Sequence, residues 1–327
     1  MKESLTTFKV LSTSPTFGYY ASEPLEYLKN HGCELELVPQ GKMMSEEELI
    51  ESVKERDAVI VGVDKITESV IQNSRRLKII AKHGVGVDNI DVKAASSKGI
   101  VVISAAGANS DAVADLTIGL LLSLARSIPF ADRSVKEGRW PRIVGAQVNG
   151  KVLGIIGLGQ IGKKVAKRAS GFDMKVIAYD IVKDEAFGQK FGVTYLSLDE
   201  LLAKSDFLSI HVPLNPSTRR LIGERELRLM KKEACLVNIS RGNIVDEEAL
   251  YRVLKEGRIR AAALDVFFSE PPKQSPLLKL DNVILTPHMG GYTFEALREI
   301  GMICARGIVD VLEGGRPRFV VNPEILE

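Results

Sequence analysis

A short segment near the middle of the chain constrains the fold more than any other. The apolar run Val152–Ile156 has the composition of a buried strand. Three glycines in a GxGxxG pattern follow it directly, at Gly157, Gly159 and Gly162. A second strand-like run, Lys175–Tyr179, ends at an acidic residue, Asp180. This order of strand, glycine turn, helix, strand and acid is typical of a dinucleotide-binding unit.

Each position of the turn has a physical reason to carry its residue. Gly157 permits the sharp turn after the strand, Gly159 lets a pyrophosphate approach the backbone, and Gly162 lets the helix pack close to the strand. The first amides of the helix, at Gln160 and Ile161, then face the phosphates together with the positive end of the helix dipole. We therefore expect this turn to bind the phosphates of a dinucleotide.

The acid at the end of the second strand is expected to select the cofactor. A carboxylate at Asp180 accepts hydrogen bonds from the adenosine ribose and repels a 2′-phosphate, which favours NAD over NADP. Lys183, a cation just past the acid, keeps NADP as an alternative cofactor. Apolar residues recur on one face of the intervening helix, at Ile161, Val165, Ala169 and Phe172. Without this context, a GxGxxG pattern is also compatible with a packing turn that binds nothing.

Length and composition place the chain among ordinary globular proteins of two domains. Its 327 residues exceed what one hydrophobic core usually serves. A net charge of +2 gives no reason to expect nucleic acid or an anionic membrane as a partner. The three cysteines, Cys33, Cys235 and Cys304, are odd in number and far apart, which argues against a disulfide framework or a metal site. We expect a cytoplasmic protein without a bound metal.

Short apolar runs alternate with helical patterns along the whole chain, which predicts parallel sheets with crossover helices. We expect an α/β fold of two Rossmann-like or flavodoxin-like lobes with a cleft between them. Residues 1–104 and 295–327 are assigned to a substrate-binding domain, and residues 105–294 to an NAD-binding Rossmann domain. The expected strands are 8–12, 34–38, 58–61, 77–81 and 100–104 in the first domain, and 152–156, 175–179, 207–211, 234–239, 261–265 and 282–286 in the second.

The segment from about Asp111 to Arg126 is predicted to form a long helix that is apolar on most sides. A helix of this kind is usually buried completely. From the residues alone, burial in a core and burial in a subunit interface are equally compatible with the pattern.

Three side chains are candidates for chemistry because each follows a predicted strand of the dinucleotide-binding domain. His288, after Thr286-Pro287, is the best placed general acid and base, although a structural histidine is the alternative. Arg241 suits bidentate capture of a carboxylate, whereas a surface ion pair is the common role of arginine. Glu270 is placed to hydrogen-bond an imidazole and favour its protonated form, or it is an ordinary loop acid. His211 ends a strand and is expected to line the cofactor.

Together these motifs resemble the D-isomer-specific 2-hydroxyacid dehydrogenases over nearly the whole chain. The resemblance is carried by Lys82–Asn89, Asn109, Val113–Asp115, Gly157–Gly162, Asp180, His211–Leu214, Asn238–Gly242, Val245-Asp246, Asp265–Pro272 and Thr286–His288. It implies an NAD-dependent enzyme in which Arg241 binds the substrate carboxylate and keto oxygen, Glu270 supports the histidine, and His288 exchanges the proton. It also implies a homodimer built around the long helix, which favours an interface there.

The resemblance further implies contacts with the cofactor and the substrate. Asp265 is expected to bind the nicotinamide carboxamide, Ser240 and Arg241 to border the nicotinamide ring, and Pro213 and Thr218 to border the adenine side. The substrate carboxylate is expected on the backbone amides of a loop with Asn109 nearby. The residues of that substrate loop are Lys82, Gly84, Val85 and Gly86.

Within the family the chain most resembles the catalytic core of the D-3-phosphoglycerate dehydrogenases, which implies a role in serine biosynthesis. Two positions bear on the phosphate. Lys82 stands where that subfamily usually has an arginine, and Gly62 stands where it often has another arginine. Loss of the second cation keeps glyoxylate, hydroxypyruvate or another 2-hydroxyacid open as the substrate. Asp115 stands where glutamate is common in the family.

Two other classes share parts of the pattern. The L-lactate and malate dehydrogenases carry the fingerprint at the N-terminus, so the complete lobe before Gly157 argues against them. The C-terminal-binding corepressors share the expected fold and the catalytic-looking residues, but act as NAD-sensing binding modules. Tight NADH binding without turnover of any 2-keto acid would favour such a module.

Overall fold

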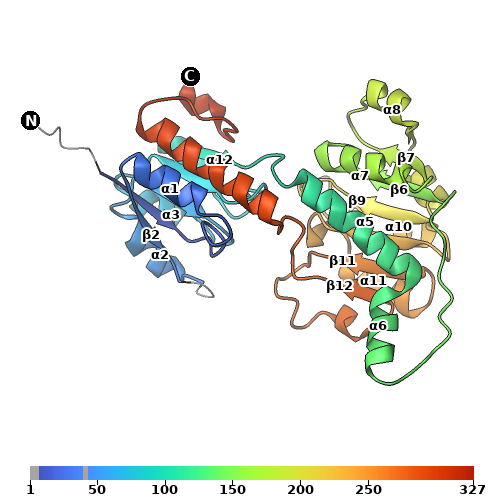
Figure 1. The fold of residues 1–327 in the computed structure, drawn as a ribbon. Helices are drawn as coiled ribbons and strands as arrows, with labels where there is room; N and C mark the ends of the chain where they lie inside the picture. Colours follow the sequence, from blue (N-terminus) through green and yellow to red (C-terminus); the bar gives the residue numbers. More distant parts are fainter. Residues whose placement is uncertain (1–6, 40–42) are drawn as a thin grey trace, which may run out of the picture. The chain divides into compact units, whose positions relative to one another are not determined.

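The computed structural model describes residues 7–39 and 43–327, which divide into two compact units. Unit 1 is formed by Met1–Asn109 as far as it is described, together with Gly291–Glu327, and unit 2 is formed by Ser110–Gly290. These boundaries lie within five residues of the expected ones. Each unit is a parallel α/β sheet covered by helices (Figure 1), which confirms the predicted fold class.

Unit 1 contains a five-stranded parallel sheet in the order β2-β1-β3-β4-β5. Its strands are β1 (Phe8–Ser12), β2 (Cys33–Leu37), β3 (Ala58–Val61), β4 (Ile79–Lys82) and β5 (Val101–Ser104). Its helices are α1 (Glu23–Asn30), α2 (Glu46–Val53), α3 (Glu68–Asn73), α4 (Val92–Ser97) and α12 (Phe294–Leu312), with η3 (Pro323–Leu326). The order reverses between β1 and β3, which is where ligands bind in open sheets of this type.

The C-terminal helix α12 completes the core of unit 1. It lies beside α1 (Figure 1), and its Gly301 approaches so closely that an added Cβ would stand 2.8 Å from Pro24. Thr293 caps the helix by accepting a hydrogen bond from the Ala296 amide at 3.2 Å. The chain therefore returns to unit 1 through α12, which begins at Phe294 directly after this cap.

Unit 2 contains a seven-stranded parallel sheet in the order β12-β11-β10-β9-β6-β7-β8. Its strands are β6 (Val152–Ile156), β7 (Lys175–Tyr179), β8 (Thr194–Tyr195), β9 (Phe207–Ile210), β10 (Cys235–Asn238), β11 (Ala261–Leu264) and β12 (Val283–Leu285). Its helices are α5 (Ser110–Arg126), α6 (Ile128–Lys136), α7 (Gln160–Ser170), α8 (Glu185–Phe191), α9 (Leu198–Lys204), α10 (Glu224–Leu229) and α11 (Glu247–Lys255), with η1 (Gly242–Ile244) and η2 (Pro276–Lys279). The chain crosses from one half of this sheet to the other between β6 and β9, which defines its switch point.

Two details of unit 2 differ from the expectation. The edge strand β8 is absent from the expected strands, because two residues at a sheet edge carry no periodic signal. Phe172 is expected on the buried face of α7, but the helix ends at Ser170 and Phe172 is 38% exposed. Val165 and Ala169 are fully buried, as the period predicts.

The long helix α5 packs against α7 within unit 2. Arg168 of α7 donates to Asp115 at 2.6 Å and to Asp111 at 3.0 Å on α5, which gives the shorter acid at position 115 a structural partner. Among the described residues no single helix is long and apolar enough to cross a membrane. Within the same described residues, α5 and α6 taken together are long and apolar enough, but the two helices are bent by 62° at the break between them.

Candidate active site

The glycine turn of unit 2 has the geometry that phosphate binding requires. Gly157 has a φ of +93°, and a Cβ on Gly162 would stand 2.1 Å from the Gly157 carbonyl oxygen, so both positions exclude side chains. A Cβ on Gly159 would meet nothing within 4 Å, so this position is open to a ligand. Gly159 also caps α7, whose first amides at Gln160 and Ile161 have no acceptor within the helix. The turn fits a dinucleotide pyrophosphate.

Asp180 follows β7 at the same edge of the sheet. Its carboxylate accepts hydrogen bonds from the amide of Leu158 at 2.6 Å and from that of Val182 at 2.9 Å. These bonds tie the acid to the glycine turn and fix its negative charge there. The nearby cation Lys183 lies over the ring of Tyr195, with its Nζ 5.9 Å from the ring centroid.

His288 and Glu270 form a close pair. His288 follows β12, Glu270 follows β11, and these two strands are neighbours in the sheet. The Nδ1 atom of His288 lies 2.7 Å from Oε2 of Glu270, and the two side chains remain 49% and 37% exposed. An imidazole held by a carboxylate on one nitrogen is oriented to exchange a proton at the other.

The environment keeps Glu270 ionised. Burial raises the pKa of this carboxyl, but the hydrogen bond and charge of His288, the Phe267 amide and the charge of Arg241 outweigh burial. The net pKa lies below its usual value. Glu270 therefore stays negative beside the imidazole and fixes its orientation through Nδ1.

Arg241 follows β10, the next strand of the sheet, so the three candidate catalytic residues lie in loops that follow consecutive neighbouring strands. Asn238, which is 1% exposed, donates from Nδ2 to the Arg241 carbonyl at 3.0 Å. Its Oδ1 accepts from the amide and the hydroxyl of Ser240. Sequence reasoning gave Asn238 no role, although an amide at the end of a buried strand is a typical signal of a fixed turn.

Asp265 holds the loop that carries His288. Its buried carboxylate accepts from the Thr286 hydroxyl at 2.7 Å and from the amides of Met289 and Gly290, both at 2.8 Å. His288 itself has a φ of +52°, a left-handed conformation that a non-glycine residue adopts only when its surroundings impose it. The predicted role of Asp265 toward nicotinamide stays a prediction; its observed contacts are with this loop.

The residues predicted on the adenine side close a turn of their own. The hydroxyl of Thr218 donates to the carbonyl of Pro213 at 2.6 Å. His211 is partly buried after β9, where its Nε2 lies 2.7 Å from the Ser209 hydroxyl. Its buried Nδ1 has no hydrogen-bond partner within the described residues.

The predicted substrate loop belongs to unit 1 and follows β4. The amide of Gly84 donates to the Lys82 carbonyl at 2.9 Å, so one of the three amides expected to hold a carboxylate already has an acceptor. Within residues 7–39 and 43–327, the amides of Val85 and Gly86 donate to no backbone carbonyl. Asn109 lies beside Gly291 within unit 1, where a Cβ added to Gly291 would stand 3.1 Å from Nδ2 of Asn109.

Lys82 is buried rather than directed into solvent. It is 9% exposed, and its Nζ donates to the Gly62 carbonyl at 2.5 Å and to Oδ1 of Asn89 at 2.8 Å. Gly62 follows β3 and packs against Ser14, whose Cα would stand 3.1 Å from an added Cβ. The next residue after Lys82, His83, is partly buried, and its Nδ1 lies 3.0 Å from the Ser14 hydroxyl.

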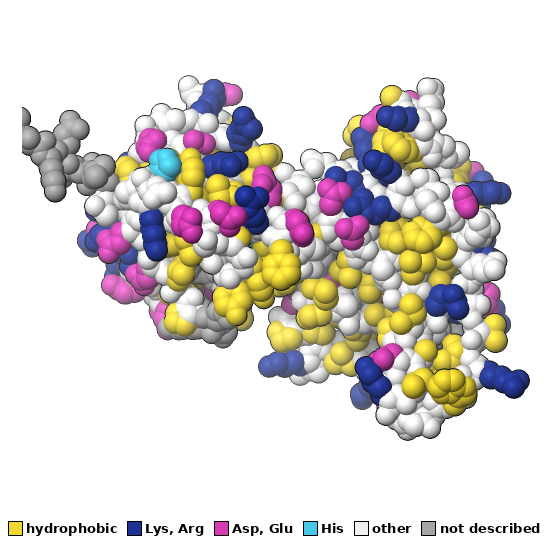
Figure 2. Space-filling model, in the orientation of Figure 1, with side chains coloured by type: hydrophobic (Ala, Val, Ile, Leu, Met, Phe, Trp, Pro, Cys, Tyr) yellow, Lys and Arg dark blue, Asp and Glu magenta, His cyan; other side chains and the backbone are white. Residues whose placement is uncertain are grey.

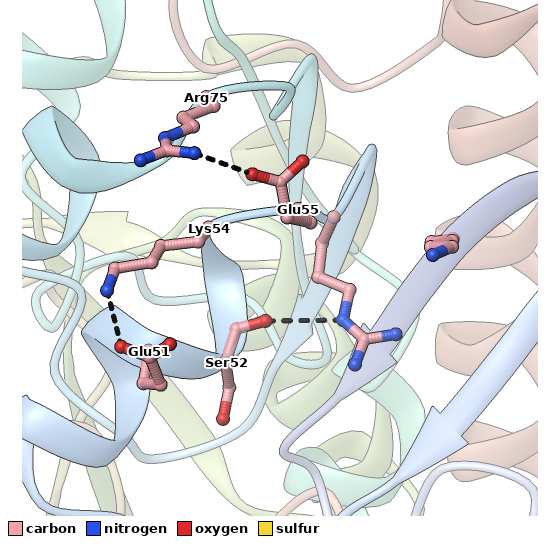
Figure 3. Close-up of a pocket in the computed structure, with 7 residues that line it drawn as sticks. Glu51, Ser52, Lys54, Glu55 and Arg75 are labelled. Carbon is pink, nitrogen blue, oxygen red and sulfur yellow. Dashed lines mark hydrogen bonds and ion pairs between the residues drawn. The ribbon is translucent and has the colours of Figure 1, made fainter.

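A pocket of about 390 Å³ in unit 1 contains none of these residues. It is lined by Lys9, Glu51, Ser52, Lys54, Glu55, Arg56 and Arg75. Figure 3 shows Lys54 paired with Glu51 and Arg75 paired with Glu55. Exposed pairs of this kind contribute little and neutralise one another, so the pocket gives no sign of a ligand. Among the described residues, no group of three or more His, Cys, Asp or Glu side chains is arranged to hold a metal.

The imidazoles of His83 and His211, each with one ring nitrogen buried, predict a loss of stability in weak acid. Burial lowers the pKa of His211 to about 3, and burial together with the charge of Lys82 lowers the pKa of His83 to about 4. In the unfolded chain both imidazoles take up protons near pH 6.5. Below that pH the unfolded state therefore binds more protons than the folded state, and the free energy of unfolding decreases as the pH is lowered. We expect each unit to lose about 2 kcal/mol of unfolding free energy between pH 7 and pH 5.

Urea unfolding at several pH values measures this loss. The variants His83→Gln in unit 1 and His211→Gln in unit 2 should each flatten the pH dependence of their own unit. An unfolding free energy that is constant from pH 7 to pH 5 in the unmodified protein would contradict buried, neutral imidazoles.

Comparison with known proteins places the chain in one family of dehydrogenases. Residues 118–290 match the model of the D-isomer specific 2-hydroxyacid dehydrogenase NAD-binding domain. A D-3-phosphoglycerate dehydrogenase of Methanocaldococcus jannaschii is 50% identical over 283 residues, which are 85% of this chain and 54% of the relative. A glyoxylate reductase of Korarchaeum cryptofilum is 42% identical over 302 residues, which are 90% of this chain and 91% of the relative.

The fold has a solved counterpart over nearly its full length. The TT0316 protein of Thermus thermophilus is 35% identical with a TM-score of 0.89, covering 96% of this chain and 100% of that one. This chain spans little more than half of the length of the Methanocaldococcus relative. The cofactor of the matched domain is NAD, as the glycine turn and Asp180 predict. The chain belongs to the D-isomer-specific 2-hydroxyacid dehydrogenase family.

Proposed function

We propose that this protein interconverts a D-2-hydroxyacid and its 2-keto acid with NAD. The observation that carries the proposal is the 2.7 Å pair of His288 and Glu270 at the edge of the sheet that carries the glycine turn. Arg241 follows the next strand, and its positive charge adds to the larger effect of His288 in lowering the pKa of Glu270. These groups supply a proton carrier, an anion to orient it and a cation for the substrate.

The proposed mechanism follows from charge. NADH, when bound, supplies the hydride to the keto carbon, and negative charge then develops on the keto oxygen. Arg241 stabilises this charge with its guanidinium, and His288 delivers the proton that converts the oxygen to a hydroxyl. Glu270 holds the imidazole through Nδ1 and leaves Nε2 to face the substrate. In the oxidising direction, His288 accepts the hydroxyl proton.

We assign D-3-phosphoglycerate as the first candidate substrate. The support is the 50% identity to a relative that bears this activity in its name, together with the sequence motifs of the substrate loop. A second candidate is an unphosphorylated acid such as glyoxylate or hydroxypyruvate. Its support is the bare Gly62 and the buried position of Lys82, together with 42% identity to a glyoxylate reductase.

Oxidation of NADH with a panel of 2-keto acids tests both levels of the proposal. Turnover of 3-phosphohydroxypyruvate at least about tenfold more efficient than that of hydroxypyruvate and glyoxylate is expected for the first candidate, because a lost charged contact costs this much or more. The reverse order supports the second candidate. Tight NADH binding without turnover of any member overturns the enzymatic proposal and favours a binding module.

We also propose a homodimer around α5, α6 and the segment that follows them. This segment carries exposed apolar side chains, including Trp140 at 86% and Val144 at 88% exposure, with Ile128 and Val135 half exposed on α6. Hydrophobic side chains gather over α5 and α6 in Figure 2. An exposed apolar surface of this kind is typical of an interface. Sedimentation equilibrium should give twice the chain mass of 35.8 kDa.

A further inference from the structure

The substrate loop of unit 1 has little structure of its own. Residues 83–90 form no helix or strand, and Gly84 and Gly86 leave the backbone free to take many conformations. One end of the loop is anchored where the Gly84 carbonyl accepts from the Ala105 amide at 2.8 Å. The other end is anchored where the Asn89 carbonyl accepts from the Ile66 amide at 2.8 Å. The stretch between these anchors carries the amides of Val85 and Gly86.

A clamp of two side chains spans this stretch. Nζ of Lys82, at the start of the loop, lies 2.8 Å from Oδ1 of Asn89, near the end of the loop. Both side chains also bind the Gly62 carbonyl, Lys82 at 2.5 Å and Nδ2 of Asn89 at 3.2 Å. Nδ2 of Asn89 donates in addition to the Asp64 carbonyl at 2.6 Å. The clamp therefore joins both ends of the loop to the segment that follows β3.

Burial makes these contacts important for the ammonium group. A buried cation is stable only while carbonyl or carboxylate oxygens replace the water that it has lost. Lys82 is 9% exposed, and two of its acceptors are oxygens of this chain. Breaking the clamp would leave the side-chain carbonyl of Asn89 without its donor, which costs more than the bond alone.

Gly62 takes part in the clamp through its backbone. Its carbonyl is the acceptor shared by both members of the clamp. A side chain at this position would press on Ser14, because an added Cβ stands 3.1 Å from the Ser14 Cα. The bare backbone at Gly62 thus keeps β3 close to the loop after β1 and offers its carbonyl to Lys82.

We propose that Lys82 is a positioning residue that acts through Asn89 and Gly62, and that it sets the position of the Val85 and Gly86 amides for the substrate carboxylate. This proposal rests on the proposed function, since it assigns Lys82 a task in the same reaction. It differs from a role in which Lys82 reads a phosphate on the far end of the substrate. A positioning role acts on every 2-keto acid equally, because all of them share the carboxylate.

Steady-state kinetics of Lys82→Met and Asn89→Leu on glyoxylate, hydroxypyruvate and 3-phosphohydroxypyruvate distinguish the two roles. We expect Lys82→Met to raise KM by about tenfold to a hundredfold on every substrate that the unmodified enzyme turns over, with a smaller effect on kcat. Asn89→Leu should raise KM similarly, and the double variant should be little worse than either single variant, because both break one clamp. Lys82→Arg keeps donors at this position and should recover most of the loss.

Controls keep a folding defect apart from a kinetic one. Lys78→Met removes an exposed lysine at the opposite end of β4 and should leave all three KM values unchanged. Affinity for NADH, which depends on unit 2, should be unaltered in every variant. A loss confined to 3-phosphohydroxypyruvate, with Asn89→Leu unaffected, would overturn the positioning role. Absence of turnover by the unmodified protein on all three acids would instead overturn the proposed function.

Discussion

Replacement of His288 by alanine is expected to lower kcat by a factor of about 10² to 10⁴, the usual contribution of a positioned general acid. The physical reason is that the keto oxygen then receives its proton from water instead of an imidazole held 2.7 Å from Glu270. Arg241→Ala should cause a loss of similar size, because the developing negative charge loses its cation. NADH affinity should change little in either variant, since the glycine turn and Asp180 are untouched.

Two further variants make this prediction specific. Glu270→Gln preserves the size of the side chain but removes its charge, so it should lower kcat less than His288→Ala and shift the pH profile of the reaction. His31→Ala removes a histidine of unit 1 whose Nδ1 contacts the Tyr27 carbonyl, and it should have no effect on turnover. A kcat for His288→Ala within about threefold of the unmodified enzyme would contradict the assigned proton transfer.

Alanine at two glycines of the same turn is expected to have different effects on the stability of unit 2. In Gly162→Ala the new Cβ would stand 2.1 Å from the Gly157 carbonyl, so α7 must move away from β6. Overpacking of this kind costs about 1–3 kcal/mol, and we expect both a lower unfolding free energy of unit 2 and weaker NAD binding. In Gly159→Ala the new Cβ meets nothing within 4 Å, so stability should be retained.

The two variants should nevertheless share a loss of cofactor affinity. At Gly159 the methyl group would occupy the space through which a pyrophosphate reaches the first amides of α7. NADH titration by fluorescence, together with thermal unfolding, measures both properties. Unchanged NADH affinity in Gly159→Ala would show that the phosphates do not approach the backbone at this turn.

Much of the fold was predictable because local patterns carry it. The strands Phe8–Ser12, Val152–Ile156 and Lys175–Tyr179 have the predicted bounds, since each is a short apolar run with a clear break at both ends. The strand β8 and the exposure of Phe172 were not predictable from period alone, because both depend on where a helix stops and which surface covers it. The long helix α5 was correctly placed, but its pattern could not distinguish a core from an interface.

The candidate site was likewise predictable in part from the sequence. Residue type and position after apolar runs were enough to identify the groups that could do chemistry: the GxGxxG turn, the acid after the second strand, and Arg241, Glu270 and His288. These local signals could not show how the groups meet. The folded chain places β10, β11 and β12 side by side, so that three loops separated in sequence lie at one sheet edge.

Lys82 shows most clearly why the contacts of a side chain could not be predicted from the sequence. Its residue type predicts a cation for a charged substrate, and nothing nearby in the sequence reveals that its partners are Asn89 and the carbonyl of Gly62. Side-chain burial depends on contacts between segments that are distant along the chain, and no local pattern records them. The amino-acid sequence was sufficient to recognise the family and to name the candidate site residues, whereas the folded structure was needed to show that the charge of Lys82 is held inside unit 1 by Asn89 and the Gly62 carbonyl.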